Sequence, residues 1–259
     1  MSVRSSRRSL LRHGFAVAAA GLLAVTSPAA ASASVGGGNV SVSWSIGNTP
    51  AAGLSNITFP LTVNKATAHQ SGIYFAQQFG FTGAPDVGYT GLQPRPDSGG
   101  HERLSARFSS FVAGSTTTDP LCHEGADGGP GVTCAVDFDA VYGHRYDLRV
   151  QRSGSDTWTG TARDTVTGKE THLGTWTLPS GSGNLRGSQG GFVEYYAGIP
   201  SCAQMPRSDA VFGGPTSTDA GGLGGTSRAN YEYSDCVGES NYHAENDGSG
   251  THVTRGFVS

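Results

Sequence analysis

Short stretches in which every second residue is apolar recur along most of the chain. Turn sequences rich in glycine separate them, such as those at 97–100, 153–154 and 167–168. Alternation of this kind is typical of a strand that buries one face, and no stretch has the apolar spacing of a helix. The pattern predicts an all-β protein, a single antiparallel β-sandwich of the jelly-roll or concanavalin-like type. The clearest alternating stretches are 40–46, 57–63, 73–75, 104–108, 146–150 and 192–196.

The first 33 residues have the layout of a secretory signal peptide. Four arginines and no acid precede the apolar stretch 15–25, and an Ala-Ser-Ala cleavage site follows at 31–33. The pair Arg7-Arg8 favours the twin-arginine type of export signal. The apolar stretch is too short for a membrane span, which takes roughly 20 residues. We therefore expect a secreted protein with one domain over 34–259 and no membrane anchor after cleavage.

Charge and composition narrow the range of partners. The full chain has a net charge of −3, and removal of the leader leaves 13 basic and 20 acidic residues, a net charge of −7. Neutralisation of phosphates by basic side chains supplies most of the affinity for nucleic acids. The acidic chain is therefore not expected to bind DNA or RNA. The 40 glycines and the low charged fraction of 14% indicate tight turns and wide loops.

All four cysteines lie in the part expected to be exported. An even number of cysteines in an oxidising compartment indicates two disulfides. Three connectivities are open, and sequential pairing is favoured because Cys122–Cys134 and Cys202–Cys236 would each close a glycine-rich loop. No two cysteines have the close spacing of a zinc site.

Two tryptophans are predicted to face each other across a hairpin. A three-residue loop that ends at Gly168 sets the register. The predicted pairs are Trp158 with Trp176, Gly160 with Gly174, and Ala162 with His172. The tryptophan pair is either a ridge of the core, which is the favoured interpretation, or an exposed shelf on which a sugar ring stacks.

Glu194 is the sharpest candidate for chemistry. It lies in the strand sequence GFVEYY at 191–196, which looks like the nucleophile strand of family 11 xylanases. Retaining glycoside hydrolysis needs a second carboxyl group roughly 5–5.5 Å away. Glu232, which lies between two tyrosines on another expected strand, is the candidate for it. The alternative is a solvated or ion-paired surface glutamate.

A second group of candidates lies around the end of an expected strand near residue 94. Tyr89 and Gln93 share one face of that strand, and Arg95 follows between two prolines. A tyrosine ring, an amide and a guanidinium group can stack on a sugar and bind its hydroxyls. A structural turn with a solvated Arg95 is the alternative. The predicted carbohydrate-binding set is Tyr89, Gln93, Arg95, Glu194, Tyr196, Trp158 and Trp176.

Two loops rich in Asp and Gly, 124–131 and 245–248, offer oxygen atoms to a cation. Neither has the EF-hand order, and Ca²⁺ takes six to eight oxygens. A Ca²⁺ site that includes Asp127 is therefore an alternative to an ordinary turn, and no cofactor is expected. No nucleophile-elbow, P-loop or zinc-protease motif occurs, while a dispersed Ser–His–Asp triad stays open.

Several short motifs resemble, in their order and spacing, a family of secreted bacterial proteins described only as a domain of unknown function. The motifs are IYFAQ at 73–77, GYTGLQ at 88–93, RLSARFS at 103–109, EGADGGPG at 124–131 and YGHRY at 142–146. The resemblance covers about residues 70–200. It implies a concanavalin-like β-sandwich that is extracellular and often encoded near polysaccharide-processing genes. It implies no reaction and no catalytic residues.

These observations favour a secreted, non-catalytic, lectin-like protein that binds an extracellular polysaccharide or other glycan. A secreted glycoside hydrolase or polysaccharide lyase that uses Glu194 is the second hypothesis. The third is a structural or protein-binding envelope protein without a sugar site. A cleft shared by Tyr89, Gln93 and Glu194 would favour the first two hypotheses, and scattered positions would favour the third.

Overall fold

Strands make up most of the residues that the structure, a computed structural model, describes, which are 34–257. The signal peptide expected at 1–33 lies outside these residues. Helix within 34–257 is confined to two short 3-10 turns, Cys202–Gln204 (η1) and Asp219–Gly221 (η2). No helix in this range has the length and apolar character of a membrane span. The expected all-β fold is confirmed, whereas the jelly-roll connectivity stays a prediction.

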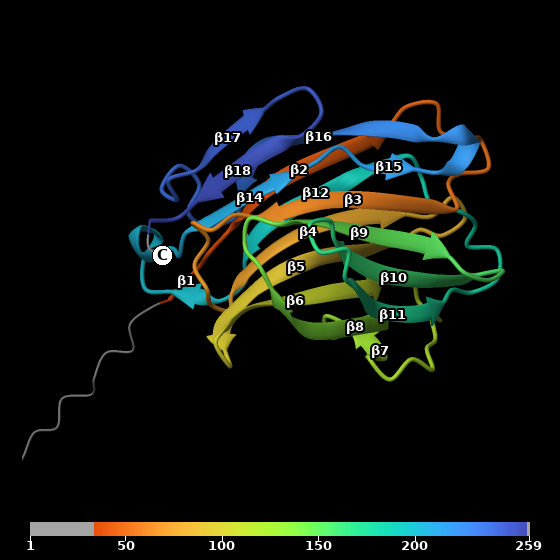
Figure 1. The fold of residues 1–259 in the computed structure, drawn as a ribbon, viewed down its shortest axis with the longest axis horizontal. Coiled ribbons are helices and arrows are strands. Elements are labelled where there is room, and N and C mark those ends of the chain that lie inside the picture. Colours follow the sequence, from red (N-terminus) through yellow and green to blue (C-terminus); the bar gives the residue numbers. More distant parts are fainter. Residues whose placement is uncertain (1–33, 258–259) are drawn as a thin grey trace, which may run out of the picture. The chain divides into compact units, whose positions relative to one another are not determined.

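Figure 1 shows the strands of the described chain in their arrangement in space. In chain order they are β1 (Val35–Gly36), β2 (Asn39–Ile46), β3 (Asn56–Val63), β4 (Ile73–Gly80), β5 (Val87–Ser98), β6 (His101–Ser110), β7 (Cys122–Ala126), β8 (Gly129–Ala140), β9 (Arg145–Arg152), β10 (Thr157–Asp164), β11 (Glu170–Thr177), β12 (Ser188–Tyr195), β13 (Gly198–Ile199), β14 (Ser208–Phe212), β15 (Thr216–Ser217), β16 (Leu223–Tyr233), β17 (His243–Asn246) and β18 (Thr251–Arg255).

Most of these strands belong to one large antiparallel sheet that curls back on itself. Its order is β11-β10-β9-β3-β15-β16-β2-β12-β4-β5-β6-β8-β7, and β14, β18 and β17 extend it from β3. The first strand of this order, β11, packs against β6, β7 and β8 near its other end. The green strands β9, β10 and β11 therefore lie over the yellow strands β5 and β6 (Figure 1). The core fills the space between these two layers.

The pairing of four neighbouring strands sorts their side chains onto two faces. Val193 of β12 pairs with Phe75 of β4, which pairs with Leu92 of β5, which pairs with Ala106 of β6. All four side chains are buried in the core. Because successive side chains of a strand point to opposite faces, the residues between these positions face away from the core. That second face forms the floor of the cleft described below.

The hairpin of β10 and β11 confirms two of its three predicted pairs. Trp158 pairs with Trp176, and Gly160 pairs with Gly174. The prediction that Ala162 pairs with His172 is wrong, because a β-bulge after Gly160 shifts the register and pairs His172 with Thr161. The extra residue of a bulge moves all later pairs by one position.

The two tryptophans form part of the core. Trp158 and Trp176 are 0% and 1% exposed. The ring of Trp176 stacks on Phe108 with 4.7 Å between centroids, and that of Trp158 lies 5.7 Å from Phe81. The core alternative is therefore confirmed, and these two residues have no surface on which a sugar ring could stack.

Both favoured disulfides are present. Cys122–Cys134 joins β7 to β8 at directly paired positions, and Cys202–Cys236 joins η1 to the segment after β16. Gly174 of β11 lies against the first bridge, where a Cβ atom would overlap both sulfur atoms. Its φ of 151° is also one that other residues rarely adopt. The missing side chain thus lets the layer of β11 close onto the disulfide.

We expect Gly174→Ala to lower the free energy of unfolding by about 2–4 kcal/mol, from overpacking against the disulfide and backbone strain. Gly224→Ala is the matched control, because a Cβ there meets nothing within 4 Å and its φ is ordinary. This control should change stability by less than about 0.5 kcal/mol. Urea unfolding of both variants measures the difference, and equal midpoints would contradict the close packing of β11 on the disulfide.

Candidate active site

Glu194, Tyr74 and Gln93 form a row across three neighbouring strands on the face opposite the core. Glu194 of β12 pairs with Tyr74 of β4. The register of β4 with β5, in which Phe75 pairs with Leu92, brings Tyr74 level with Gln93. The period of two along each strand places all three side chains on one face. A carboxylic acid, a phenol and an amide thus become neighbours although they are far apart in the sequence.

This row lies in a cleft made of two adjoining hollows. The larger has a volume of about 740 Å³ and includes Tyr74, Gln93 and Tyr196 in its lining. The smaller has a volume of about 530 Å³ and is lined by residues of β2, β12 and β16 among others. Both hollows share Tyr89, Asp127, Phe192 and Glu194. Glu194 therefore stands where the two halves meet, with open space on either side of it.

Two arginines hold the side chain of Gln93 in one orientation. Its Oε1 atom accepts a hydrogen bond of 2.6 Å from Nη2 of Arg95 and one of 3.3 Å from Nε of Arg107. Gln93 is only 7% exposed. Since both arginines donate to the oxygen, the amino group is the part of the amide that remains for a ligand. No other described residue hydrogen-bonds to that amino group.

Glu194 is half-buried and makes no side-chain hydrogen bond or ion pair with any described residue. Burial raises the pKa of its carboxyl group above the usual range, and the nearby charge of Asp127 raises it further. Both causes act against the ionised form. A carboxyl group in such a place exchanges a proton more readily at moderately acidic pH than a solvated glutamate does.

Asp127 lies in the turn between β7 and β8, and it lines both hollows of the cleft. Both of its carboxylate oxygens accept from the hydroxyl of Tyr89, at 3.2 Å each. Burial, and next the charge of Asp127, raise the pKa of Tyr89 to about 12. This phenol therefore stays protonated and donates to Asp127, which fixes the tip of the hairpin against the floor of the cleft.

The loops considered for Ca²⁺ form turns in the structure. Asp247 accepts hydrogen bonds from the backbone N–H groups of Ser249 and Gly250, which is the geometry of an Asp-stabilised turn. Among residues 34–257, no group of three or more His, Cys, Asp or Glu side chains could hold a metal ion. The Ca²⁺ site considered at Asp127 stays a prediction. The expectation that the protein needs no cofactor stays a prediction.

Of the predicted site residues, Tyr89, Gln93, Glu194 and Tyr196 line this one cleft. Arg95 lies at its edge, where Nη1 donates to the hydroxyl of Tyr196 at 3.4 Å. The cleft thus joins residues that the sequence placed on separate strands. The two tryptophans are not part of it.

Glu232 is not a partner of Glu194, which corrects the prediction of a second carboxyl group there. A β-bulge in β16 pairs Glu232 with Val40, which also pairs with Val193. Its side chain therefore points to the core side, whereas that of Glu194 points into the cleft. Glu232 lies 3.6 Å from Nε of the buried Arg255 and accepts from Gly238 and Ser240. This network is structural and ties β16 to the last strand.

Sequence reasoning missed Tyr74, Arg107 and the position of Asp127 in the cleft. The first two lie in stretches whose alternation was recognised, so correct strand pairing would have placed them beside Gln93. Asp127 is different, because only the fold of the β7–β8 turn over the sheet brings it near Glu194. No local pattern in the sequence signals that contact.

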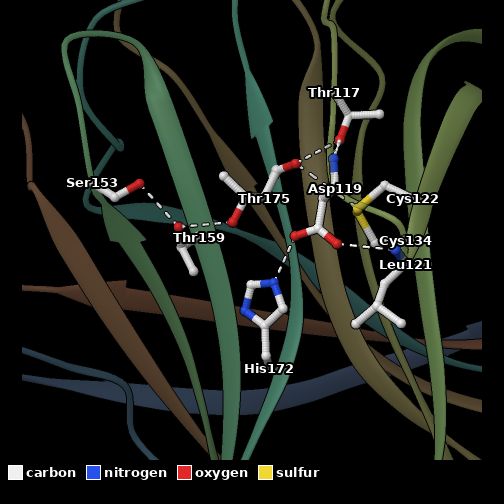
Figure 2. Close-up of polar contacts among 9 residues, drawn as sticks. All are labelled: Thr117, Asp119, Leu121, Cys122, Cys134, Ser153, Thr159, His172 and Thr175. Carbon is white, nitrogen blue, oxygen red and sulfur yellow. Dashed lines mark hydrogen bonds and ion pairs between the residues drawn. A yellow bond between two sulfur atoms is a disulfide. The ribbon is translucent and has the colours of Figure 1, made fainter.

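The sequence did not decide whether a Ser–His–Asp triad is present. The described residues include Asp–His pairs, but none of these histidines hydrogen-bonds to a serine or threonine hydroxyl. Figure 2 shows the pair of Asp119 and His172, whose Nε2 lies 2.6 Å from the carboxylate. The hydroxyls of Ser153, Thr159 and Thr175 instead form a separate chain of hydrogen bonds, which runs from the loop after β9 to β10 and β11 (Figure 2). No histidine among residues 34–257 has a hydroxyl group as its hydrogen-bond partner. A triad is therefore not assembled in this part of the chain.

Comparison with known proteins gives neighbours only among solved structures. No family model and no curated protein matches the chain. Two structures of scytalido-glutamic peptidase, one with a transition-state analogue inhibitor and one with a peptide-based analogue, match at 12% and 13% identity with TM-scores of 0.48. A structure of SCP-B, a member of the eqolisin family of peptidases, in complex with the tripeptide Ala-Ile-His matches at 12% identity and a TM-score of 0.44. Each alignment covers 85% of this chain and 98% of the other.

The expectation of a non-catalytic, lectin-like protein that binds glycans is not supported, since the three solved structures named above are those of peptidases. The geometry of the cleft changes the predicted set of site residues. Trp158 and Trp176 drop out of the predicted carbohydrate-binding set because they lie in the core. Glu232, the second carboxyl group of the glycoside-hydrolase hypothesis, points to the core side. Tyr89, Gln93 and Glu194 share one cleft, which favours a binding or catalytic site over a structural protein without one.

We expect Asp127→Asn to lower the pKa of Glu194, because it removes the negative charge that opposes ionisation while an acceptor for Tyr89 remains. Titration of the Glu194 side-chain carboxyl carbon by NMR measures the shift. Glu124→Gln is the control, since Glu124 lines the same cleft but does not affect this pKa. An unchanged pKa in Asp127→Asn would assign the whole shift to burial.

Proposed function

We propose that this protein is an exported hydrolase that cleaves peptide bonds, with Glu194 as general base and Gln93 as the group that stabilises the developing oxyanion. The observation that carries the proposal is the fixed amide of Gln93. Two arginines hold its oxygen, its amino group has no hydrogen-bond partner among the described residues, and the residue lines the same cleft as Glu194. A preorganised N–H donor aimed at a carbonyl oxygen is what acyl transfer requires.

The reaction follows from these two groups and one water molecule. In its ionised form, Glu194 takes a proton from the water as the water oxygen forms a bond to the carbonyl carbon. The electron pair of the C=O double bond moves onto the oxygen, to which the Gln93 amino group donates a hydrogen bond. Glu194 then gives the proton to the amide nitrogen, the C–N bond breaks, and the products are a carboxylic acid and an amine.

The raised pKa of Glu194 suits both halves of this cycle. A base with a pKa near the working pH takes a proton from water more effectively than a strongly acidic carboxylate, and it can still return the proton to the leaving amine. Among residues 34–257 the cysteines are paired in disulfides, and no histidine hydrogen-bonds to a hydroxyl group that it could activate as a nucleophile. Direct attack by water is the route that these residues support.

The shape of the cleft favours an extended polymer as substrate. Open space continues on both sides of Glu194, and the exposed rings of Tyr196 and Tyr231 line its two halves. A polypeptide in an extended conformation can pass across Glu194 with residues bound on each side. Two disulfides in a single described domain support secretion of the protein into an oxidising compartment.

Substitution of the two proposed groups tests this function. We expect Glu194→Gln to lower kcat for cleavage of an unfolded protein by about 10³-fold or more, because the general base is lost. Gln93→Ala should lower it by about 10²–10³-fold, the usual cost of one oxyanion donor. Mass spectrometry of the peptides released across acidic to neutral pH measures both effects.

Glu245→Gln serves as the matched control, since Glu245 is an exposed glutamate outside the cleft. It should cleave at the wild-type rate. Equal rates of polypeptide cleavage by wild type and Glu194→Gln would show that Glu194 is not the general base. A wild-type protein that cleaves no unfolded polypeptide at any pH tested would overturn the proposed function as a whole.

A further inference from the structure

The hydroxyl of Tyr74, a residue that lines the larger hollow of the cleft, is a buried polar group without a hydrogen-bond partner. Tyr74 is 3% exposed, and its Oη atom has no hydrogen bond in the structure. The residue lies between Glu194 and Gln93 in the row described above and lines the larger hollow. Buried hydroxyl groups nearly always have a hydrogen-bond partner, so an orphaned one calls for a physical explanation.

The ring of Tyr74 is held firmly, so the hydroxyl has a defined position. It packs edge-on against Tyr89 and Phe192, with 5.4 Å between centroids in each case. On a third side lies Gly91, where a Cβ atom would come within 2.7 Å of Cε2 of Tyr74. Glycine at this position therefore makes room for the ring. The hydroxyl is placed by packing and not by a hydrogen bond of its own.

The surroundings keep this hydroxyl protonated. Burial raises the pKa of Tyr74 well above that of a free phenol, and Tyr89, Asp127 and Glu194 raise it further, against the opposing effect of Arg107. These four groups come from β5, the β7–β8 turn, β12 and β6. The phenol is therefore a donor at acidic and neutral pH.

We propose that Tyr74 is a third catalytic residue, whose hydroxyl donates a second hydrogen bond to the substrate carbonyl oxygen as negative charge develops on it. This inference rests on the proposed function. A donor that is unpaired in the free protein gains its hydrogen bond only when a ligand oxygen arrives. Its contribution is greatest when that oxygen carries charge, because hydrogen bonds to charged groups are about twice as strong as neutral ones. Such a group stabilises the transition state more than the bound substrate.

Tyr74→Phe tests the inference, because it removes only the orphaned oxygen atom. We expect kcat to fall by about 10–100-fold with KM changed by less than about 3-fold, as for the loss of a donor used in the transition state. Affinity for a peptide phosphonate, which mimics the tetrahedral intermediate, should fall by the same factor as kcat. The free energy of unfolding should be unchanged or higher, because no hydrogen bond of the free protein is lost.

Tyr142→Phe is the matched control. Tyr142 is also fully buried, but its hydroxyl donates to the backbone oxygen of Arg103 at 3.2 Å, outside the cleft. This variant should lose stability and keep kcat, which is the opposite result. A stability loss in Tyr74→Phe as large as in Tyr142→Phe would show that its hydroxyl is structural.

The outcomes separate this inference from the function on which it rests. If wild type cleaves polypeptides and Tyr74→Phe has the same kcat and phosphonate affinity, the inference is wrong and the function stands. If kcat falls while phosphonate affinity is unchanged, the hydroxyl does not bind the oxyanion, and the inference is again wrong. If wild type cleaves no polypeptide, both the proposed function and the inference about Tyr74 are wrong.

Discussion

The hydrogen-bond register of β12, β4 and β5 is the constraint on which the cleft depends. Antiparallel pairing fixes which residues lie side by side, and the period of two fixes the face to which each side chain points. One register places Val193, Phe75 and Leu92 together in the core. The same register places Glu194, Tyr74 and Gln93 together in the cleft. A slip of one residue would exchange the two sets, so the packing of the core also positions the chemistry.

Sequence alternation was sufficient for the fold class and for part of the site. It placed Tyr89 and Gln93 on one strand face and marked Glu194 as a strand residue with tyrosine neighbours. The cysteine pairs followed from their order along the chain and the glycine content of the loops they close. These features are local or depend on a simple count, so they do not require knowledge of how distant strands pair.

The features that the sequence did not predict depend on long-range pairing. A bulge in β16 turns Glu232 to the core side, although its sequence context is similar to that of Glu194. A second bulge, at Gly160, moves His172 by one position. Tyr74 and Arg107 became visible as site residues only when β4, β5 and β6 were seen side by side. A bulge leaves almost no mark in alternation, since it adds a single residue to a strand.

The two arginines that orient Gln93 also make the charge distribution along the cleft uneven. Arg95 and Arg107 place positive charge at the Gln93 end of the row, and Asp127 places negative charge beside Glu194. In the proposed reaction, electron density moves from the carboxylate side through the water oxygen to the carbonyl oxygen, toward the arginines. The fixed charges thus produce an electrostatic field along the direction in which electron density shifts during the reaction. This field is present before any substrate binds.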